Sequence, residues 1–525
     1  MPITNLISAL RRAPSARMAT LFTASVALLA MISPAAAQSD SDLRQKVSGW
    51  VGGEQPRLVK ELTDLLSIPN VAADRENIRR NAAHLQKMLA ARGFAASVLE
   101  TAGNPLVFGE LRFPNATRTI LFYSHYDGQP VDPKAWKQPD PFKPVLRTGR
   151  VDQGGEIVAD ARPITKYEQD WRIYARSASD DKSPIVALLG AIDALKALGL
   201  PPTANIRVIF DGEEEASSPS LVPAIARYRD QLTADLMVIL DGPIHSSGRP
   251  TIAYGARGIA TLDLTVYGPR VGVHSGNYGN WIPNPAQRLA SLLASMKDDD
   301  GRATVKGFYD AVTALSKEEQ AIVDAVPDDA ARMLQTFGVS APEKAFPALQ
   351  AGLQYPTLNV RGLASAHVGA GARTIIPDRA TAAIDIRLVK ETRAEDLIEK
   401  LRAHIRERGF HLIAGEPDDE TRRAHQKIAS LVVSETVTNA FRTSPLDPQA
   451  RRVAVALERS FGAPPVQLRT LGGTVPIAPF IEALGFPAVL VPVVNFDNNQ
   501  HEENENLRLG HFFQAIEIIA AILRS

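Results

Sequence analysis

The sequence predicts an α/β fold in which a mostly parallel sheet, flanked by helices, is interrupted by an inserted α+β domain. In the first half of the chain, apolar segments at residues 119–123, 204–210 and 236–240 are separated by a helical pattern at residues 183–198. Strands that alternate with helices are typical of a largely parallel sheet. Leucines at helical spacing precede these strands, as far as about residue 92.

The middle of the chain follows a different pattern, which predicts the inserted domain. Residues 259–267 and 380–389 alternate apolar and polar side chains, as strands with one face in solvent do. Between them, residues 285–333 have a helical pattern. The α/β pattern returns after residue 439, with expected helices at 450–461 and 512–523 and an expected strand at 488–494. We therefore expect an α/β domain in two parts, 38–256 and 439–525, around an insertion at 257–438.

The first 37 residues have the features of a secretory signal peptide. Arg11, Arg12 and Arg17 precede an apolar stretch at residues 18–32, and the small residues that end at Ala37 follow it. A membrane-spanning helix needs ~20 apolar residues, so an uncleaved membrane anchor is the less favoured alternative. We expect an exported, periplasmic protein that is cleaved near Ala37.

The composition excludes several kinds of partner and site. The chain contains no cysteine, so any metal must be held by His, Asp and Glu side chains. The first 37 residues hold three arginines and no acid, so the mature chain carries 55 basic and 58 acidic residues, a net charge of −3. A nucleic-acid partner is not expected, because such proteins show a basic surface. We also expect no membrane partner after signal removal.

Acidic and imidazole side chains follow the predicted strands at the point where each strand ends. The carboxyl ends of strands in an open α/β sheet form binding sites, so these side chains should lie close together. Imidazole and carboxylate ligands suit zinc, and also cobalt or manganese. Two such ions make a water acidic enough to attack a carbonyl near neutral pH. The residues concerned are His125, Asp127, the run Glu213–Glu215, Asp241 and His501, together with Asp180 before a helix.

These segments resemble the ligand signature of the dinuclear zinc amidohydrolases. That family includes carnosinase-like dipeptidases, glutamate carboxypeptidase, aminoacylases and succinyl-diaminopimelate desuccinylases. The motifs occur in the family's order and extend over almost the whole mature chain, insertion included. They are His125-Tyr126-Asp127, Ser179-Asp180-Asp181-Lys182, Glu213-Glu214-Glu215, Asp241 and His501-Glu502-Glu503-Asn504-Glu505.

The resemblance implies two Zn2+ ions per chain, with Co2+ or Mn2+ as possible substitutes. It implies that His125 and Asp241 bind one ion, that Glu215 and His501 bind the other, and that Asp180 bridges them. A carboxylate beside a metal-bound imidazole usually orients it, which is the role implied for Asp127.

Glu214 is implied as the general base that deprotonates the attacking water and then protonates the leaving amine. Glu213, one residue earlier, is not assigned this role. Glu502, Glu503 and Glu505 are interpreted as a solvated acidic turn, and the histidines outside the motifs as structural.

In the insertion, the resemblance implies a lid and dimerisation domain. His274 corresponds to a lid histidine that stabilises the oxyanion in a neighbouring subunit, which implies a homodimer. Arg387 corresponds to an arginine that binds the substrate carboxylate, a task that suits the planar guanidinium. Thr374 and the turn residues Gly473 and Thr474 correspond to further substrate contacts.

Two positions depart from the family pattern. Ser183 stands where glycine is common, which should be tolerated. Leu471 stands where carnosinase-like dipeptidases often have a glutamate that meets the free amine of the substrate. The expected substrate is a small peptide, cleaved by a dipeptidase or carboxypeptidase-like activity. Leu471 favours the alternative, an N-acyl-amino-acid deacylase on the same site. A non-catalytic binding protein with this fold is a third possibility, which the complete set of ligands and base disfavours.

The signal peptide generates the first testable prediction. N-terminal sequencing of the exported protein should begin just after Ala37, because the small residues there form the cleavage site. Finding Met1 on the mature protein would contradict it.

Overall fold

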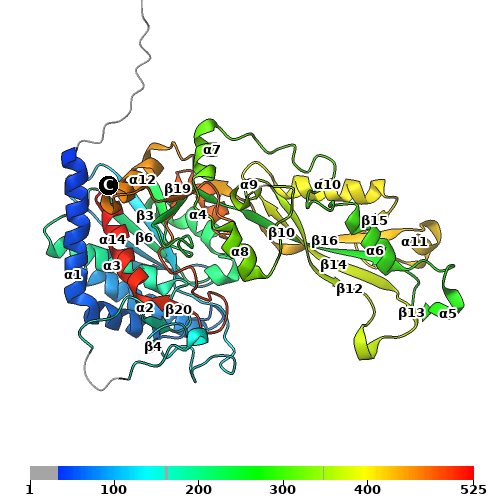
Figure 1. Cartoon of the computed structure of the whole chain (residues 1–525), viewed down its shortest axis with the longest axis horizontal. Helices are drawn as coiled ribbons and strands as arrows, with labels where there is room; N and C mark the ends of the chain where they lie inside the picture. The colour runs from blue at the N-terminus through cyan, green and yellow to red at the C-terminus, as the bar shows by residue number, and fades with distance from the viewer. Residues whose placement is uncertain (1–33, 160–163, 347) are drawn as a thin grey trace, which may run out of the picture.

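The computed structural model describes residues 34–159, 164–346 and 348–525 (Figure 1). The predicted signal peptide therefore lies outside the described residues up to position 33. Within the described ranges, no helix is both long enough and apolar enough to cross a membrane. Figure 1 shows two bodies, one built around the N-terminal and C-terminal helices and a longer one that extends away from it.

The first body contains an eight-stranded sheet in the described part of the chain. Its central strands β6, β3, β7 and β19 are parallel, and β1 and β2 add an antiparallel edge. This arrangement confirms the predicted fold class. In spatial order the strands are β1 (Ala95–Leu99), β2 (Leu106–Leu111), β6 (Asn205–Asp211), β3 (Thr119–His125), β7 (Leu236–Ile239), β19 (Ala488–Leu490), β8 (Thr251–Ala253) and β18 (Val466–Leu468).

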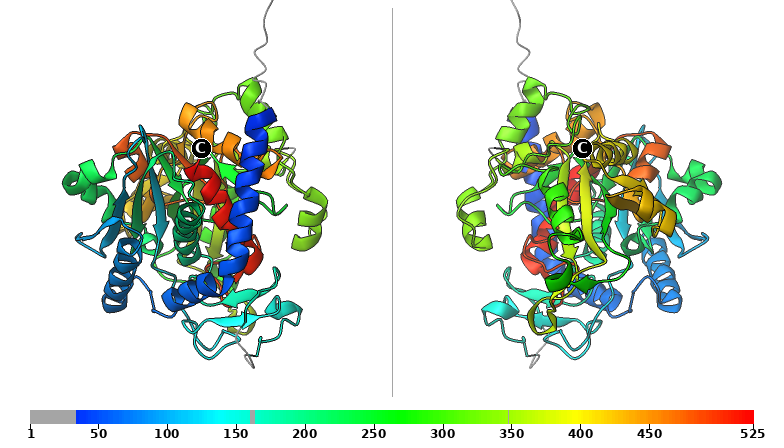
Figure 2. Two further views of the ribbon diagram at one scale, coloured as in Figure 1. Left: turned by 90° about the vertical axis from the view of Figure 1, so that its left-hand side faces the viewer. Right: turned by 90° about the vertical axis from the view of Figure 1, so that its right-hand side faces the viewer.

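Helices cover both faces of this sheet, because its central strands are apolar on both sides. Along β3, Phe122 packs into one buried cluster and Tyr123 into the cluster on the opposite face. In the left view of Figure 2, α1 (blue) and α14 (red) lie side by side on the first face. The helices on that face are α1 (Pro34–Leu66), α2 (Arg75–Ala90), α3 (Lys182–Ala197), α12 (Pro448–Phe461) and α14 (Leu509–Leu523), and those on the other are α4 (Leu221–Leu232) and α13 (Ala478–Leu484).

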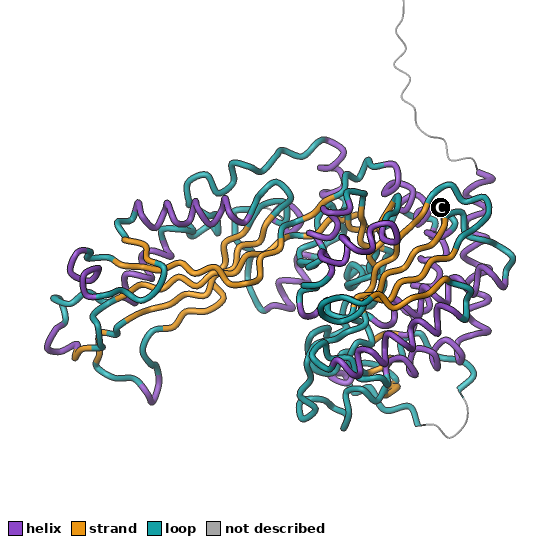
Figure 3. The backbone as a smooth tube through the Cα atoms, turned by 180° about the vertical axis from the view of Figure 1, so that it is seen from behind, coloured by secondary structure: helices purple, strands orange, loops and turns teal. Residues whose placement is uncertain are grey.

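The second body is built on a five-stranded sheet with its own apolar cluster. Helices α6 (Pro285–Ala294) and α10 (Ala394–Glu407) pack on one face, through Leu289 and Leu401 among others. Figure 3 shows these long strands pointing away from the first body. In spatial order they are β12 (Thr357–Ala364), β14 (Arg379–Leu388), β10 (Gly258–Tyr267), β16 (Ile428–Thr438) and β15 (His411–Ile413).

Shorter elements connect and extend these two sheets. A three-stranded sheet is formed by β20 (Asn506–Arg508), β5 (Arg172–Tyr174) and β4 (Val145–Arg147), and short pairs by β17 (Phe441–Arg442) with β9 (Gly255–Ala256) and by β11 (Val273–His274) with β13 (Ile375–Ile376). The remaining α-helices are α5 (Ser275–Tyr278), α7 (Lys317–Asp324), α8 (Ala330–Phe337), α9 (Leu349–Gly352) and α11 (Asp419–Ala424), and the 3-10 helices are η1 (Val151–Gln153), η2 (Glu214–Ala216) and η3 (Gly369–Gly371).

Two elements are shorter in the structure than the sequence predicts. The helical region expected at 285–333 is broken after α6, because the Asp-Asp-Asp-Gly sequence at 298–301 forms a turn with Gly301 at φ 91°. Helix α7 then starts afresh from a capping box between Ser316 and Glu319. The strand expected at 488–494 ends at Leu490, just before Pro492, which has no N–H to donate to a sheet.

The packing of α3 against α1 and α14 generates a stability prediction. A Cβ atom added to Gly190 would lie 3.1 Å from methyl groups of both Ile516 and Leu58. Gly190→Val should therefore lower the free energy of unfolding by about 1–3 kcal/mol through overpacking. Denaturant-induced unfolding of the purified protein measures this change.

Gly53, in α1, provides the matched control, because an added Cβ there meets no atom within 4 Å. Gly53→Val should leave stability unchanged or slightly improved, since valine has a better helix propensity than glycine. Equal unfolding midpoints for the two variants would show that the α3 interface tolerates the extra volume.

Candidate metal centre

The candidate site lies at the carboxyl edge of the eight-stranded sheet. His125 ends β3, and Asp211 lies opposite it at the end of β6. Tyr123 pairs with Ile239 of β7, so Asp241 emerges at the same edge. Asp180 approaches from the start of α3, whose N-cap is Asp181. The parallel register therefore gathers side chains that are distant in sequence, as expected for an open α/β sheet.

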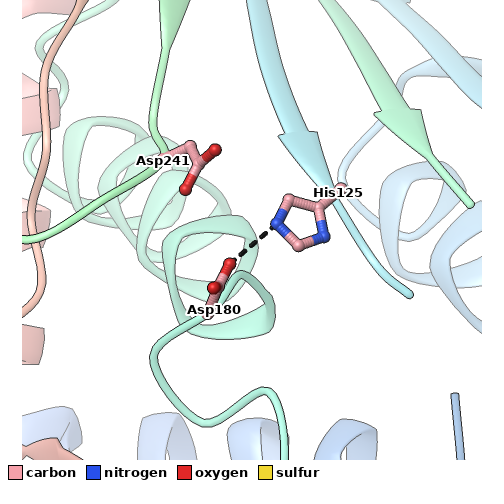
Figure 4. Close-up of side chains that lie close together, drawn as sticks. All are labelled: His125, Asp180 and Asp241. Carbon is pink, nitrogen blue, oxygen red and sulfur yellow. Dashed lines mark hydrogen bonds and ion pairs between the residues drawn. The ribbon is translucent and has the colours of Figure 1, made fainter. Parts of the chain in front are cut away.

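The structure brings the five predicted ligands into two groups that share one residue. One group is His125, Asp180 and Asp241, and the other is Asp180, Glu215 and His501; within each group the ligand atoms lie within 4.8 Å of one another. Figure 4 shows the first group, with the carboxylate of Asp180 facing the imidazole of His125.

Asp180 lies between the two histidines. Its Oδ1 is 2.8 Å from Nε2 of His125, and its Oδ2 is 3.1 Å from Nε2 of His501. The same His501 nitrogen is 3.5 Å from Oε2 of Glu215. His125 is fully buried, whereas the His501 side chain is 52% exposed. The centre is therefore open to solvent on the His501 side.

Asp127 organises the surroundings of both groups from a fully buried position. Its Oδ1 lies 3.3 Å from Nδ1 of His125, which leaves the Nε2 atom of that ring facing Asp180. Its two carboxylate oxygens also accept the backbone N–H groups of Glu214 and Glu215, each at 3.0 Å. One carboxylate thus fixes a histidine of the first group and the segment that carries a glutamate of the second.

The electrostatics of the centre favour a bound cation. Burial raises the pKa of Asp241 to about 6 and that of Glu215 to about 7, and repulsion from Asp180 adds to both shifts. The hydrogen bond to Asp180 raises the pKa of His501 to about 9, despite partial burial. Carboxylates crowded in this way are stabilised in their charged form by a nearby positive charge.

The donor set fits metal ions. Imidazole nitrogen and carboxylate oxygen are the ligands that zinc takes from proteins without cysteine. Two groups that share Asp180 provide two adjacent positions for divalent ions.

The three consecutive glutamates point to different partners. Glu213 accepts the backbone N–H groups of Asn104 and Ser220, so its carboxylate is used in holding a loop. Glu215 belongs to the second ligand group and accepts a hydrogen bond from Gln129 at 2.6 Å, a contact that no sequence motif predicts. Glu214 belongs to neither group, is 9% exposed, and has its pKa raised by burial and by nearby carboxylates.

His274 and Thr374 lie far from these ligands in the same chain. His274 directly precedes α5, and Thr374 directly precedes β13, at the end of the long body in Figure 1. Both side chains are exposed, with Nε2 of His274 3.4 Å from Oγ1 of Thr374. Nδ1 of His274 accepts the backbone N–H groups of Gly276 and Asn277.

Arg387, Gly473 and Thr474 meet where the two bodies join. Nη1 of Arg387, near the end of β14, donates a hydrogen bond of 2.8 Å to Oγ1 of Thr474. The carbonyl of Gly473 accepts the N–H of Arg257 at 3.1 Å. The arginine predicted to bind substrate is therefore already tied to one of the predicted turn residues.

Glu505 corrects the sequence analysis. It was expected in a solvated acidic turn, but its side chain is 0% exposed and binds the loop that carries Asp180. Glu502 and Glu503 are exposed, as expected. The local sequence around Glu505 is polar on both sides, so no local signal distinguishes the buried glutamate from its exposed neighbours.

A two-part cluster of imidazole and carboxylate side chains at this sheet edge is typical of metal-dependent enzymes. The family model described as Peptidase family M20/M25/M40 matches residues 121–525, from within β3 to the C-terminal residue. The chain belongs to this family and is a metallopeptidase, which confirms the resemblance inferred from the motifs.

Individual relatives agree with this assignment. The chain is 26% identical over 419 residues to a Cys-Gly metallodipeptidase of Schizosaccharomyces pombe, covering 79% of this chain and 81% of that protein. It is 28% identical over 426 residues to the human Beta-Ala-His dipeptidase, covering 79% and 76%. Among solved structures, a family M20 metallo-carboxypeptidase from Sulfolobus solfataricus superimposes with a TM-score of 0.71 at 28% identity, covering 89% of this chain and 98% of that one.

The position of Asp127 generates a prediction on metal affinity. Asp127→Asn should weaken zinc binding by about 10–100-fold, because an amide cannot accept both N–H groups and still orient His125. Zinc titration of the metal-stripped protein against a competing chelator measures this.

The control is Asp211→Asn, which alters another buried carboxylate at the same sheet edge, bonded to Tyr123, Ser218 and the backbone N–H of Glu213. The carbonyl oxygen of asparagine can still accept that single N–H. This variant should bind zinc with nearly normal affinity. An equal loss of affinity in both variants would assign the effect to general destabilisation.

Proposed function

We propose that this metallopeptidase is an exported enzyme that uses two zinc ions to hydrolyse the peptide bond of a dipeptide or similar small peptide. The observation that carries the proposal is the pair of ligand groups joined by Asp180, with Glu214 beside both and bound to neither. The names of the relatives, which include Cys-Gly and Beta-Ala-His dipeptidases, support a small peptide substrate.

His125 and Asp241 would hold one ion, Glu215 and His501 the other, and Asp180 would contribute to both positions. Cobalt or manganese suits the same ligands. When bound, the metal ions supply Lewis acidity that lowers the pKa of a water and polarises the scissile carbonyl.

Glu214 is the general base of the proposed reaction. It takes a proton from the attacking water as the water oxygen bonds to the carbonyl carbon, and it delivers that proton to the amide nitrogen as the C–N bond breaks. Its backbone N–H is fixed by Asp127, and its carboxylate is almost fully buried. Burial raises the pKa of Glu214, which suits a group that must hold the proton between the two steps.

Substrate recognition is assigned to the junction between the two bodies. Arg387 would bind the substrate carboxylate, with Thr474 and Gly473 alongside it. His274 and Thr374 are too far along the second body to act on their own metal centre, so we assign them to the site of a second subunit. A homodimer formed through residues 257–438 would supply His274 as an oxyanion donor, which contributes on the order of 3 kcal/mol.

A deacylase that removes the acyl group from an N-acyl amino acid is the second candidate. Leu471 favours it, because this side chain packs against an apolar cluster and offers no charge to a free substrate amine. A non-catalytic binding protein, the third alternative, would leave the buried Glu214 beside both ligand groups without a role.

Export to the periplasm is proposed from the sequence alone. The arginines and the apolar stretch before Ala37 support it.

Amide hydrolysis by the mature protein tests the proposal. Dipeptides and N-acyl amino acids are supplied with and without zinc, and Glu214→Gln is assayed in parallel. That variant should lose about 10²–10⁴-fold in kcat, the usual contribution of general acid–base catalysis, while still binding metal. Glu502→Gln, an exposed glutamate near His501, should keep full activity.

Turnover of dipeptides would support the first candidate, and turnover of N-acyl amino acids alone would support the deacylase. Metal binding without turnover of any panel member would contradict both substrate assignments. Full activity in Glu214→Gln would remove this residue from the mechanism.

A further inference from the structure

The carboxylate of Glu505 is buried against the loop that carries Asp180. Its Oε1 accepts the backbone N–H groups of Ser179 at 2.9 Å and Asp180 at 3.0 Å, and the Ser179 hydroxyl at 3.0 Å. Its Oε2 accepts the N–H of Ser177 at 2.9 Å and Nη1 of Arg176 at 2.8 Å. A side chain in the C-terminal segment thus binds four of the five residues from Arg176 to Asp180.

The backbone of this loop is shaped to receive an anion. Ser177 has φ 61°, in the left-handed region that residues other than glycine seldom adopt. Such a turn directs successive N–H groups toward one point and forms a concave anion site. The Glu505 carboxylate fills it, and Arg176, 3% exposed, balances the charge. The unusual turn and the buried carboxylate therefore stabilise each other.

Glu505 also joins two segments that supply different ligands. It lies four residues after His501, in the connection between β19 and β20. Its hydrogen bonds attach this connection to the loop of Asp180. Asp180 and His501, whose side chains lie 3.1 Å apart, therefore belong to two segments that Glu505 joins.

We propose that Glu505 is a positioning residue for both metal sites, acting through Asp180. The inference rests on the proposed two-ion function. Asp180 is the carboxylate common to the two ligand groups, so a shift of its loop disturbs both. Substitution of Glu505 should therefore lower zinc affinity at both positions, as substitution of Asp180 would. Substitution of His501 should affect mainly one position, although Glu505 and His501 share one segment.

Two substitutions separate positioning from charge. Glu505→Gln keeps the length of the side chain but places an N–H₂ group against backbone N–H donors. Glu505→Asp keeps the negative charge but is one methylene shorter, so it cannot reach the same donors. If Glu505 positions the loop, both variants lose zinc affinity. If Glu505 contributes only negative charge, the Glu505→Asp variant retains normal zinc affinity.

The experiment is zinc titration of the metal-stripped full-length chain against a competing chelator. We expect Glu505→Gln and Glu505→Asp each to lower the affinity for both zinc ions by tenfold or more. His501→Ala should lower the affinity mainly for one ion, and Asp180→Asn should lower it for both. Glu502→Gln, exposed in the same segment, is the control and should bind as the wild type does.

Loss of a single ion in Glu505→Gln, or normal affinity in Glu505→Asp, would overturn the proposal. Wild-type protein that binds fewer than two ions would instead contradict the two-ion function, so the two failures are distinguishable. Circular dichroism of the metal-free variants monitors folding. If these variants do not fold, Ser179→Ala provides the test, because it removes one hydrogen bond to Glu505. It should lower the affinity for both zinc ions by two- to tenfold. Unchanged zinc affinity would contradict the proposal.

Discussion

The rest of the site depends on the two contacts of the Asp180 carboxylate, 2.8 Å to His125 and 3.1 Å to His501. These contacts require the end of β3, the start of α3 and the segment after β19 to meet at one point. The parallel order β6-β3-β7-β19 provides this, because it places strands from both ends of the chain side by side. Helix α14 then packs against α3, which supports the segment that presents Asp180.

Burial of several carboxylates in one place is unfavourable unless positive charge is close. Without bound cations, burial and mutual repulsion disfavour the charged carboxylates and raise the pKa values of Asp241 and Glu215. Bound metal ions would offset it, so metal binding and stability are coupled in such a centre. Asp127 and Glu505 accept backbone N–H groups and so hold the loops in place. The carboxylates of the two ligand groups are then free to face the metal positions.

Much of the fold followed from local sequence, and so did the gathering of polar side chains where apolar strands end, as at His125 and Asp241. The role of each ligand and of Glu214 came from the family resemblance. The alternating patterns of β10 and β14 likewise revealed the second sheet. The role of Glu505 could not be foreseen, since its burial depends on a loop more than three hundred residues earlier in the chain. The break after α6 was missed because a short turn interrupted an otherwise helical pattern.

The central claim is that two metal ions bind on either side of Asp180. Anomalous X-ray diffraction at the zinc absorption edge, from crystals of the zinc-loaded protein, tests it most directly. Two peaks are predicted, one contacting His125 and Asp241 and the other contacting Glu215 and His501, with Asp180 contacting both. A single peak, or peaks at other side chains, would contradict the account.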